Sequence, residues 1–188
     1  DAGVAGDLDV FASTLTRLTI QGAVVTVIDG AGLISGGTPD RIFHITNTVA
    51  NSCEIELVDL SIRNGAGVLR GAGVRQDGGR LALSNINLIH CAANDQGGGI
   101  YTATSQVFSM SGGGIANCSA QFNGGGVLID TPGLAQVTLN NVGISNCSVS
   151  QKGGGVRTQA GSNTIMSQCL ISGNSSTSGG GVSVRGTL

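Results

Sequence analysis

Charged side chains are scarce in this sequence. Only 11% of the 188 residues are Asp, Glu, Lys or Arg, against about a quarter in an ordinary soluble domain. The formal net charge of −2 gives no basic footprint, so nucleic-acid binding is not expected. A soluble protein with so few charges must present Ser, Thr, Asn, Gln and Gly to water. Tryptophan is absent and Tyr101 is the single tyrosine, which excludes a deep sugar site built on aromatic platforms.

Long apolar runs and clustered acids are also missing. No stretch is long and apolar enough for a membrane-spanning helix, which needs about 18 such residues. Glu54 and Glu56 lie close together at the edge of one expected strand, and from Arg80 onward the only acids are Asp95 and Asp130. Polysaccharide lyases and hydrolases need clustered carboxylates, for Ca²⁺ or for acid–base chemistry. The sequence therefore predicts no catalytic residue, no cofactor and no metal ion.

Glycine, in contrast, is abundant, at 33 of 188 residues, and much of it stands in repeated triplets. Four triplets are each followed by Ile or Val. They are Gly97, Gly98 and Gly99; Gly124, Gly125 and Gly126; Gly153, Gly154 and Gly155; and Gly179, Gly180 and Gly181. A looser copy begins at Gly71, and the five copies start 26, 27, 29 and 26 residues apart. Repetition with a period of this length is typical of solenoids.

Apolar residues recur at fixed distances from each triplet. One column contains Leu57, Leu83, Met110, Leu139 and Met166; a second Ile62, Leu88, Ile115, Ile144 and Ile171; a third Val74, Ile100, Val127, Val156 and Val182. Within each copy they alternate with other residues, as in Val137-x-Leu139, Val142-x-Ile144 and Val156-x-Thr158. Alternation over a few residues indicates a strand. Each copy thus predicts three short strands, and the bend before the third is built from glycine, which tolerates positive φ.

The predicted fold class is all-β: a single-stranded right-handed parallel β-helix, or β-solenoid, with three short strands in each coil of about 26–29 residues. Stacked coils about 4.8 Å apart bury a continuous interior column, and right-handed parallel connections are strongly preferred. Residues 1–188 are expected to form a single β-helix domain, with irregular entry coils over 1–54 and regular coils over 55–188. In the entry coils, Ser13-x-Leu15 and Leu18-x-Ile20 are expected to form the first two strands of a coil.

Three other sets of side chains align in columns. Cys91, Cys118 and Cys147 form a cysteine ladder; their sulfurs either fill an interior notch as free thiols or form one disulfide between neighbours, since stacked Cα atoms fall within disulfide range. Asn64, His90, Asn117 and Asn146 occupy a turn position that favours a polar ladder. Arg75, Tyr101, Leu128 and Arg157 point outward from the third strand and are the candidate recognition column; the alternative is an ordinary solvated sheet face. Two further residues, Cys169 and His44, are expected to be structural.

The repeats resemble the bacterial right-handed β-helix repeat proteins, including polymorphic outer-membrane-protein-like passengers and large surface adhesins. The resemblance lies in Val137-Thr-Leu-Asn-Asn-Val-Gly-Ile-Ser-Asn-Cys followed by Gly153-Gly-Gly-Val, and in Ile28-Asp-Gly-Ala-Gly, Arg41-Ile-Phe-His-Ile and Leu60-Ser-Ile-Arg-Asn-Gly. The cysteine column departs from the usual repeat, which has another small or polar residue there. The resemblance implies export and display on a cell surface.

The expected function is that of a non-enzymatic, secreted or cell-surface structural or adhesive solenoid of bacterial origin. The alternative is a β-helix enzyme, a polysaccharide lyase or hydrolase acting on acidic glycans. The strand pattern persists close to Leu188, and solenoid ends are normally covered. The expected partners are therefore a second copy, joined end to end in a filament, or the continuation of a longer chain. A cell-surface or glycan partner is also expected, with no nucleic acid and no membrane span.

Overall fold

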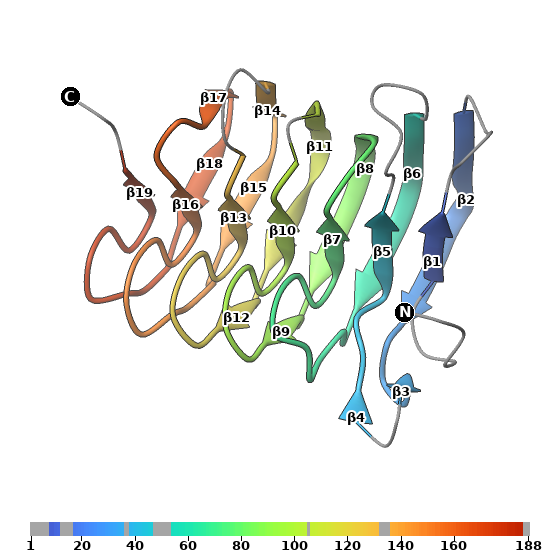
Figure 1. Ribbon diagram of the computed structural model, residues 1–188, viewed down its shortest axis with the longest axis horizontal. Helices are drawn as coiled ribbons and strands as arrows, with labels where there is room; N and C mark the ends of the chain where they lie inside the picture. Colours follow the sequence, from blue (N-terminus) through green and yellow to red (C-terminus); the bar gives the residue numbers. More distant parts are fainter. Residues whose placement is uncertain are drawn as a thin grey trace.

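The computed structural model is an all-β solenoid whose chain winds through stacked parallel sheets (Figure 1). It describes residues 8–11, 17–35, 38–46, 54–104, 106–131 and 136–185. Over these ranges every regular element is a strand, and no helix occurs. The predicted fold class, a right-handed parallel β-helix, is confirmed.

Two large parallel sheets run along the stack. Sheet A has seven strands, in the order β1 (Leu8–Phe11), β5 (Phe43–Thr46), β7 (Val74–Gln76), β10 (Ile100–Thr102), β13 (Val127–Ile129), β16 (Val156–Thr158) and β19 (Val182–Val184). Sheet B has eight strands: β2 (Arg17–Asp29), β6 (Glu54–Arg63), β8 (Arg80–Ile89), β11 (Phe108–Ala116), β14 (Gln136–Asn140), β15 (Gly143–Ser145), β17 (Asn163–Ser167) and β18 (Leu170–Ser172).

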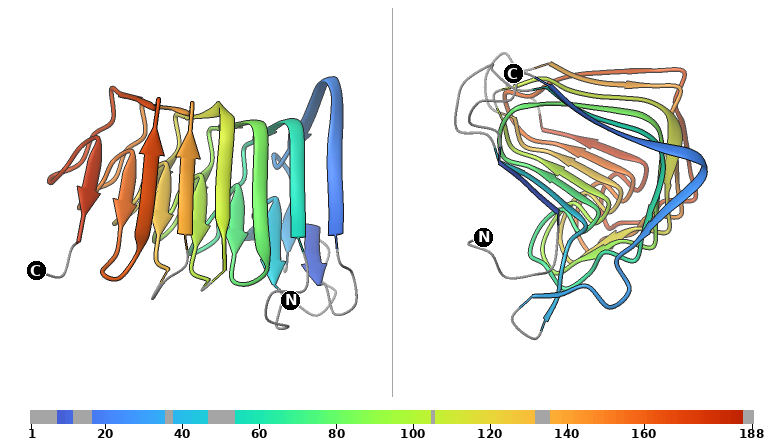
Figure 2. Two further views of the ribbon diagram at one scale, coloured as in Figure 1. Left: turned by 90° about the horizontal axis from the view of Figure 1, so that it is seen from above. Right: turned by 90° about the vertical axis from the view of Figure 1, so that its right-hand side faces the viewer.

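Four short strands complete the described structure. β9 (Ala92–Ala93) and β12 (Ser119–Ala120) form a small parallel sheet, and β3 (Ile34–Ser35) and β4 (Thr38–Pro39) pair antiparallel. Seen end on, successive coils lie over one another (Figure 2). The first two strands predicted for each coil both lie in sheet B, where β6, β8 and β11 run through the bend between them.

Each coil turns at three corners where the backbone is left-handed. In one coil these are Asn85 (φ 52°), His90 (φ 56°) and Gly97 (φ 63°). The matching positions of the other coils, all with positive φ, are Asp59, Asn64 and Gly71; Gly112, Asn117 and Gly124; Asn141, Asn146 and Gly153; and Gln168, Gly173 and Gly179. Glycine and asparagine adopt this conformation at least cost. The column that includes His90 therefore lies at the second corner.

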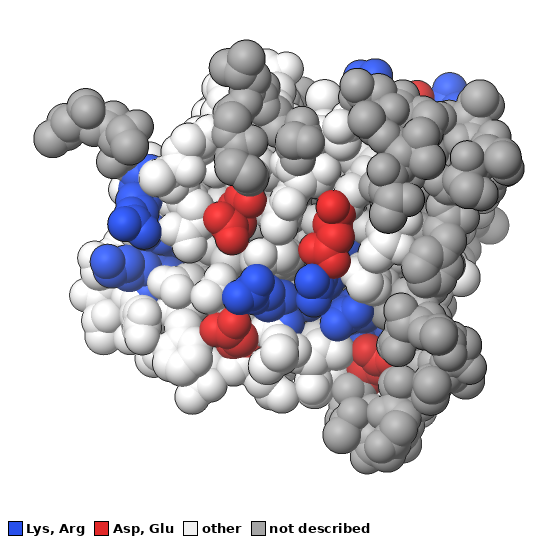
Figure 3. Space-filling view, in the orientation of Figure 1, with Lys and Arg blue, Asp and Glu red and all other residues white. Residues whose placement is uncertain are grey.

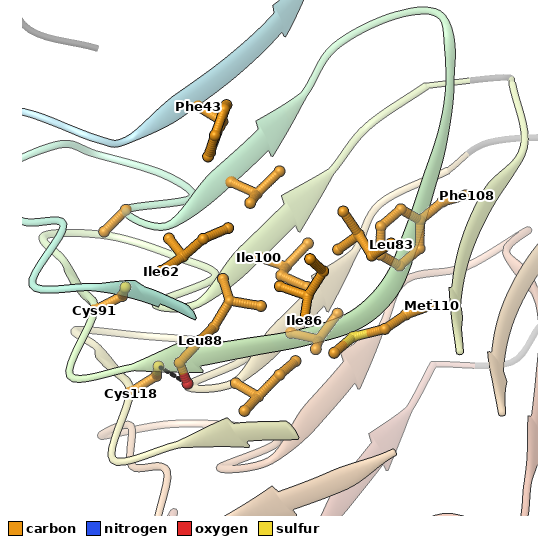
Figure 4. Close-up of a cluster of buried hydrophobic side chains, with 14 of the residues drawn as sticks. Phe43, Ile62, Leu83, Ile86, Leu88, Cys91, Ile100, Phe108, Met110 and Cys118 are labelled. Carbon is orange, nitrogen blue, oxygen red and sulfur yellow. Dashed lines mark hydrogen bonds between the residues drawn. The ribbon is translucent and has the colours of Figure 1, made fainter. Parts of the chain in front are cut away.

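The interior consists of the apolar columns that the repeat alignment predicts. Backbone register places Leu57 beside Leu83, then Met110, Leu139 and Met166, and it aligns the columns that begin at Ile62 and Val74 in the same way. Leu83, Ile86 and Leu88 point inward toward residues of the adjacent coils (Figure 4). Burial of these columns supplies the main driving force for folding.

The glycine triplets form the third corner, where backbones approach closely. Gly124 has a φ of 62°, and a Cβ on Gly125 would lie 2.5 Å from the carbonyl oxygen of Gly154 and 2.7 Å from the amide nitrogen of Ser148. Both atoms belong to the next coil. A side chain at Gly125 would therefore force two stacked coils apart.

The entry coil differs from its sequence-based assignment. Leu18 and Ile20 pair with Ile55 and Leu57, in the columns of the first strand of a coil rather than the second, so that part of the prediction is wrong. The second strand comes from the end of β2, after a register shift between Gln21 and Thr26. The extra residues at this shift lengthen the distance in sequence between the first and second strands, which the repeat alignment took to be the same in every coil. Ser13-x-Leu15 lies outside the described residues.

Candidate functional site

Charged side chains gather on the outer side of sheet A, over strands β5 to β13 (Figure 3). We call this group the sheet A cluster; it contains His44, Arg70, Arg75, Asp77, Asp95, Tyr101 and Asp130. Figure 3 shows Lys and Arg side chains in a row, with Asp and Glu on either side of it. Acids flank the row of cations, and the named cluster holds two Arg and three Asp, so it is close to neutral.

Tyr101 is the centre of the cluster. The guanidinium carbons of Arg70 and Arg75 lie 5.2 Å and 5.7 Å from its ring centroid, within the range of cation–π attraction. Its hydroxyl accepts a hydrogen bond from Arg70 (3.1 Å) and donates one to Asp130 (3.3 Å). Burial raises the pKa of Tyr101 above 10.0, with Arg70 lowering it and Asp130 raising it further. The ring is packed between two coils and leaves no open aromatic platform for a ligand.

His44 and Asp77 form a second pair in the cluster. The Nε2 atom of His44 lies 2.9 Å from Oδ2 of Asp77, which also accepts a hydrogen bond from Arg75 at 2.7 Å. Burial raises the pKa of Asp77, but the bonds from His44 and Arg75 outweigh it and the net shift is downward. Arg41 lies 3.1 Å from Nδ1 of His44, and since a guanidinium only donates, Nδ1 accepts and Nε2 carries the proton. Both ring nitrogens are thus engaged, unlike those of a general base facing a substrate.

The candidate recognition column is a column in the structure, but it is covered. Register aligns Arg75, Tyr101, Leu128 and Arg157. Tyr101, Leu128 and Arg157 are only 2%, 0% and 6% exposed, and Arg75 is half-buried. The expectation that these side chains are presented to solvent is therefore wrong for the last three. Strand alternation identified their outward direction but not what lies over them.

The cysteine ladder is buried, and its three thiols are free in the structure. Cys91, Cys118 and Cys147 have free thiols with no exposed surface, and each sulfur lies near the main-chain carbonyl two residues earlier, at 3.7, 3.4 and 3.4 Å. The pKa of the Cys118 thiol is raised. The neighbouring thiol of Cys147 is the largest cause, followed by that of Cys91 and by burial. Of the two alternatives for this column, free thiols or one disulfide, the structure contains free thiols. Cys169 is a half-buried free thiol, and Cys53 lies outside the described residues.

Carboxylates elsewhere on the stack also bind the neighbouring coil. Arg17 donates to Glu56 at 2.6 Å, and Arg63 donates to Asp29 at 2.8 Å. The Ala31 amide, then Asn64 and Arg63, lower the pKa of Asp29 to about 2. These acids are occupied by partners from adjacent coils.

A shallow depression lies on sheet B, beside the register shift of β2. It has a volume of about 560 Å³ and is lined by Gly22, Ala23, Thr26, Asp59, Leu60, Ser61, Asn85 and Asn87. Asn85 donates to Asp59 at 2.9 Å, so the one carboxylate there is already bonded. The sequence alignment did not indicate this depression, because it depends on the extra residues of β2.

Across the ranges described, no group of three or more His, Cys, Asp or Glu side chains is placed to hold a metal ion. The same residues include no helix long and apolar enough to cross a membrane. No protein-family model, curated protein or solved structure matches this chain.

Proposed function

We propose that this chain is a non-enzymatic structural or adhesive module of a secreted or bacterial cell-surface protein. The observation that carries the proposal is that many of its carboxylates are already hydrogen-bonded within the stack. Six carboxylates accept hydrogen bonds from a side chain in the adjacent coil: Asp29, Glu56, Asp59, Asp77, Asp95 and Asp130. A glycan-cleaving enzyme needs its carboxylates free to reach the substrate.

The display of the module on a bacterial surface rests on the resemblance of its glycine-punctuated repeats. A fold alone does not specify a function, because a solenoid can host many. Tyr101, the single tyrosine, is buried among arginines and offers no aromatic platform to a sugar, which disfavours a deep glycan site.

Coil-on-coil assembly belongs to the same proposal. Among the described strands, β17 and β19 lie at the edges of sheets B and A. Nearby apolar side chains are open, with Ile165, Leu170 and Val184 exposed by 45%, 70% and 67%. An exposed strand edge suits the addition of another parallel strand. We propose that a further coil of the same kind stacks on this edge, either from a second copy or from the continuation of a longer chain.

Two measurements test the proposal. The chain is incubated with acidic and neutral polysaccharides, and chain length and binding are both followed; we expect binding without shortening. Cleavage that disappears in Asp77→Asn would establish an enzyme instead. Sedimentation velocity over a wide concentration range should show growing end-to-end species, whereas a monomer at every concentration would contradict assembly.

A further inference from the structure

A second group of cationic side chains lies on the β19 end of the stack. In Figure 3 it is at the left, apart from the central group of mixed charge. A pocket of about 460 Å³ occurs there, lined by Lys152, Arg157, Ser178, Ser183, Val184 and Arg185. Three of these six residues are cations and none is an acid.

Arg157 is the buried member of this pocket. It is 6% exposed, and its Nη1 donates to the hydroxyl of Ser183 at 2.7 Å. Its Nε is buried, and no hydrogen-bond partner for it exists among the residues with described positions. Burial and the nearby charge of Arg185 lower the pKa of Arg157. A buried guanidinium beside a like charge is costly unless an anion compensates it.

The repeat shows how other coils supply that compensation. Arg75 occupies the same column as Arg157, and it is bonded to Asp77 at 2.7 Å. Asp77 is the residue directly after β7. The residue directly after β19, in the coil beside Arg157, is Arg185. The residue after the strand is an acid in the coil of Arg75, whereas it is Gln159 in the coil of Arg157 and Arg185 in the coil beyond.

The position just before the glycine corner differs between the two coils in the same way. Isolated bridges align Arg70 with Gln96, Asn123 and Lys152. Arg70 is paired with Asp95 at 3.3 Å, whereas Lys152 is exposed on the rim of the cationic pocket. The pocket thus combines a planar guanidinium fork, an ammonium, a second guanidinium and two hydroxyls. Such donors match the oxygens of a sulfate, phosphate or carboxylate group.

We propose that this pocket binds an oxyanion, the sulfate, phosphate or carboxylate group of an anionic ligand. The ligand supplies the negative charge that Asp77 supplies in the earlier coil. Val184 belongs both to this pocket and to the β19 edge on which a further coil is proposed to stack, so the two proposals concern neighbouring surfaces and are tested by separate measurements.

The test is calorimetric titration of the folded chain at constant ionic strength. The probes are sodium sulfate, inorganic phosphate, a sulfated oligosaccharide, an oligogalacturonate and a Glu-rich peptide. We expect saturable binding of the free oxyanions, and tighter binding of whichever oligosaccharide carries the matching group. Arg185→Gln should weaken it at least about tenfold, because one charge-assisted contact is lost.

Arg80→Gln is the matched control. Arg80 is exposed at the start of β8 and lies outside the pocket, so this variant makes the same change in net charge and should bind as the unmodified chain does. Arg157→Lys keeps the charge but loses the fork, and it should weaken binding while the melting temperature shows that the chain is folded. Equal binding by the Arg185→Gln and Arg80→Gln variants would overturn the proposal. So would binding of none of the probes. Binding of the Glu-rich peptide alone would support the proposal and identify a protein as the source of the carboxylate.

Discussion

Gly125 lies at the third corner between two coils, with carbonyl and amide atoms of the next coil 2.5–2.8 Å from the position of a Cβ. We predict that Gly125→Val lowers the free energy of unfolding by roughly 3 kcal/mol or more, since backbone of a packed coil has to move. Chemical denaturation followed by circular dichroism measures the change. Gly143→Val is the control, because a Cβ at Gly143 in β15 would have no atom of the described residues within 4 Å, apart from those of Gly143 and its two chain neighbours. Equal stability of the two variants would show that the corner is not crowded in solution.

Asp29 predicts how the stability of the fold changes at acidic pH. Its pKa is about 2 in the folded chain, against 3.8 for the ordinary side chain. A lowered pKa means that the charged form stabilises the fold above about pH 4, and that this contribution is lost as the pH falls toward 2. The difference in melting temperature between the unmodified chain and Asp29→Asn should therefore be largest above pH 5 and disappear near pH 2. A difference that is constant down to pH 2 would contradict the bonds from Ala31 and Asn64.

At the scale of the strands, Tyr101 in β10 reports on the sheet A cluster. It is the single tyrosine and the chain has no tryptophan, so absorbance follows its ionisation without interference. We predict a titration midpoint above pH 10 in the folded chain, because burial raises the pKa. Asp130→Asn should lower the midpoint and Arg70→Gln should raise it, since Asp130 raises and Arg70 lowers this pKa. Shifts of the same sign in both variants would contradict the observed bonding of the hydroxyl.

The strands were predictable where the pattern is local. Alternation in Val137-x-Leu139 and the spacing to the next triplet suffice to align the interior columns, because both the strand period and the coil length are regular. The covering of Tyr101 was not predictable, since Arg70 reaches it from a position before the glycine corner of the previous coil. Leu18 was misaligned for a related reason: the register shift in β2 adds residues that no repeat contains.

At the scale of the whole molecule, the strands of each described inner coil pair with those of the coils on its two sides, and in such a stack stability is nearly a sum of local terms. β8 is paired on both sides, with β6 and β11, whereas β17 is paired with β14 at one edge of sheet B. The side chains of β17 and β18 are alternately exposed and half-buried, while those of β8 include fully buried ones. Interior burial therefore decreases toward the last described coil.

Hydrogen exchange tests this gradient together with the proposed assembly. At low protein concentration, we predict that amides of β17, β18 and β19 exchange at least about tenfold faster than those of β8 and β11, because the last coil can open without disturbing the central ones. At high concentration, a stacked second copy should slow exchange in residues 163–185 and leave β8 unchanged. Peptide-resolved mass spectrometry measures both effects. Uniform exchange along the chain would show that the stack opens as one unit, and faster exchange at the last coil at every concentration would show that no further coil covers it.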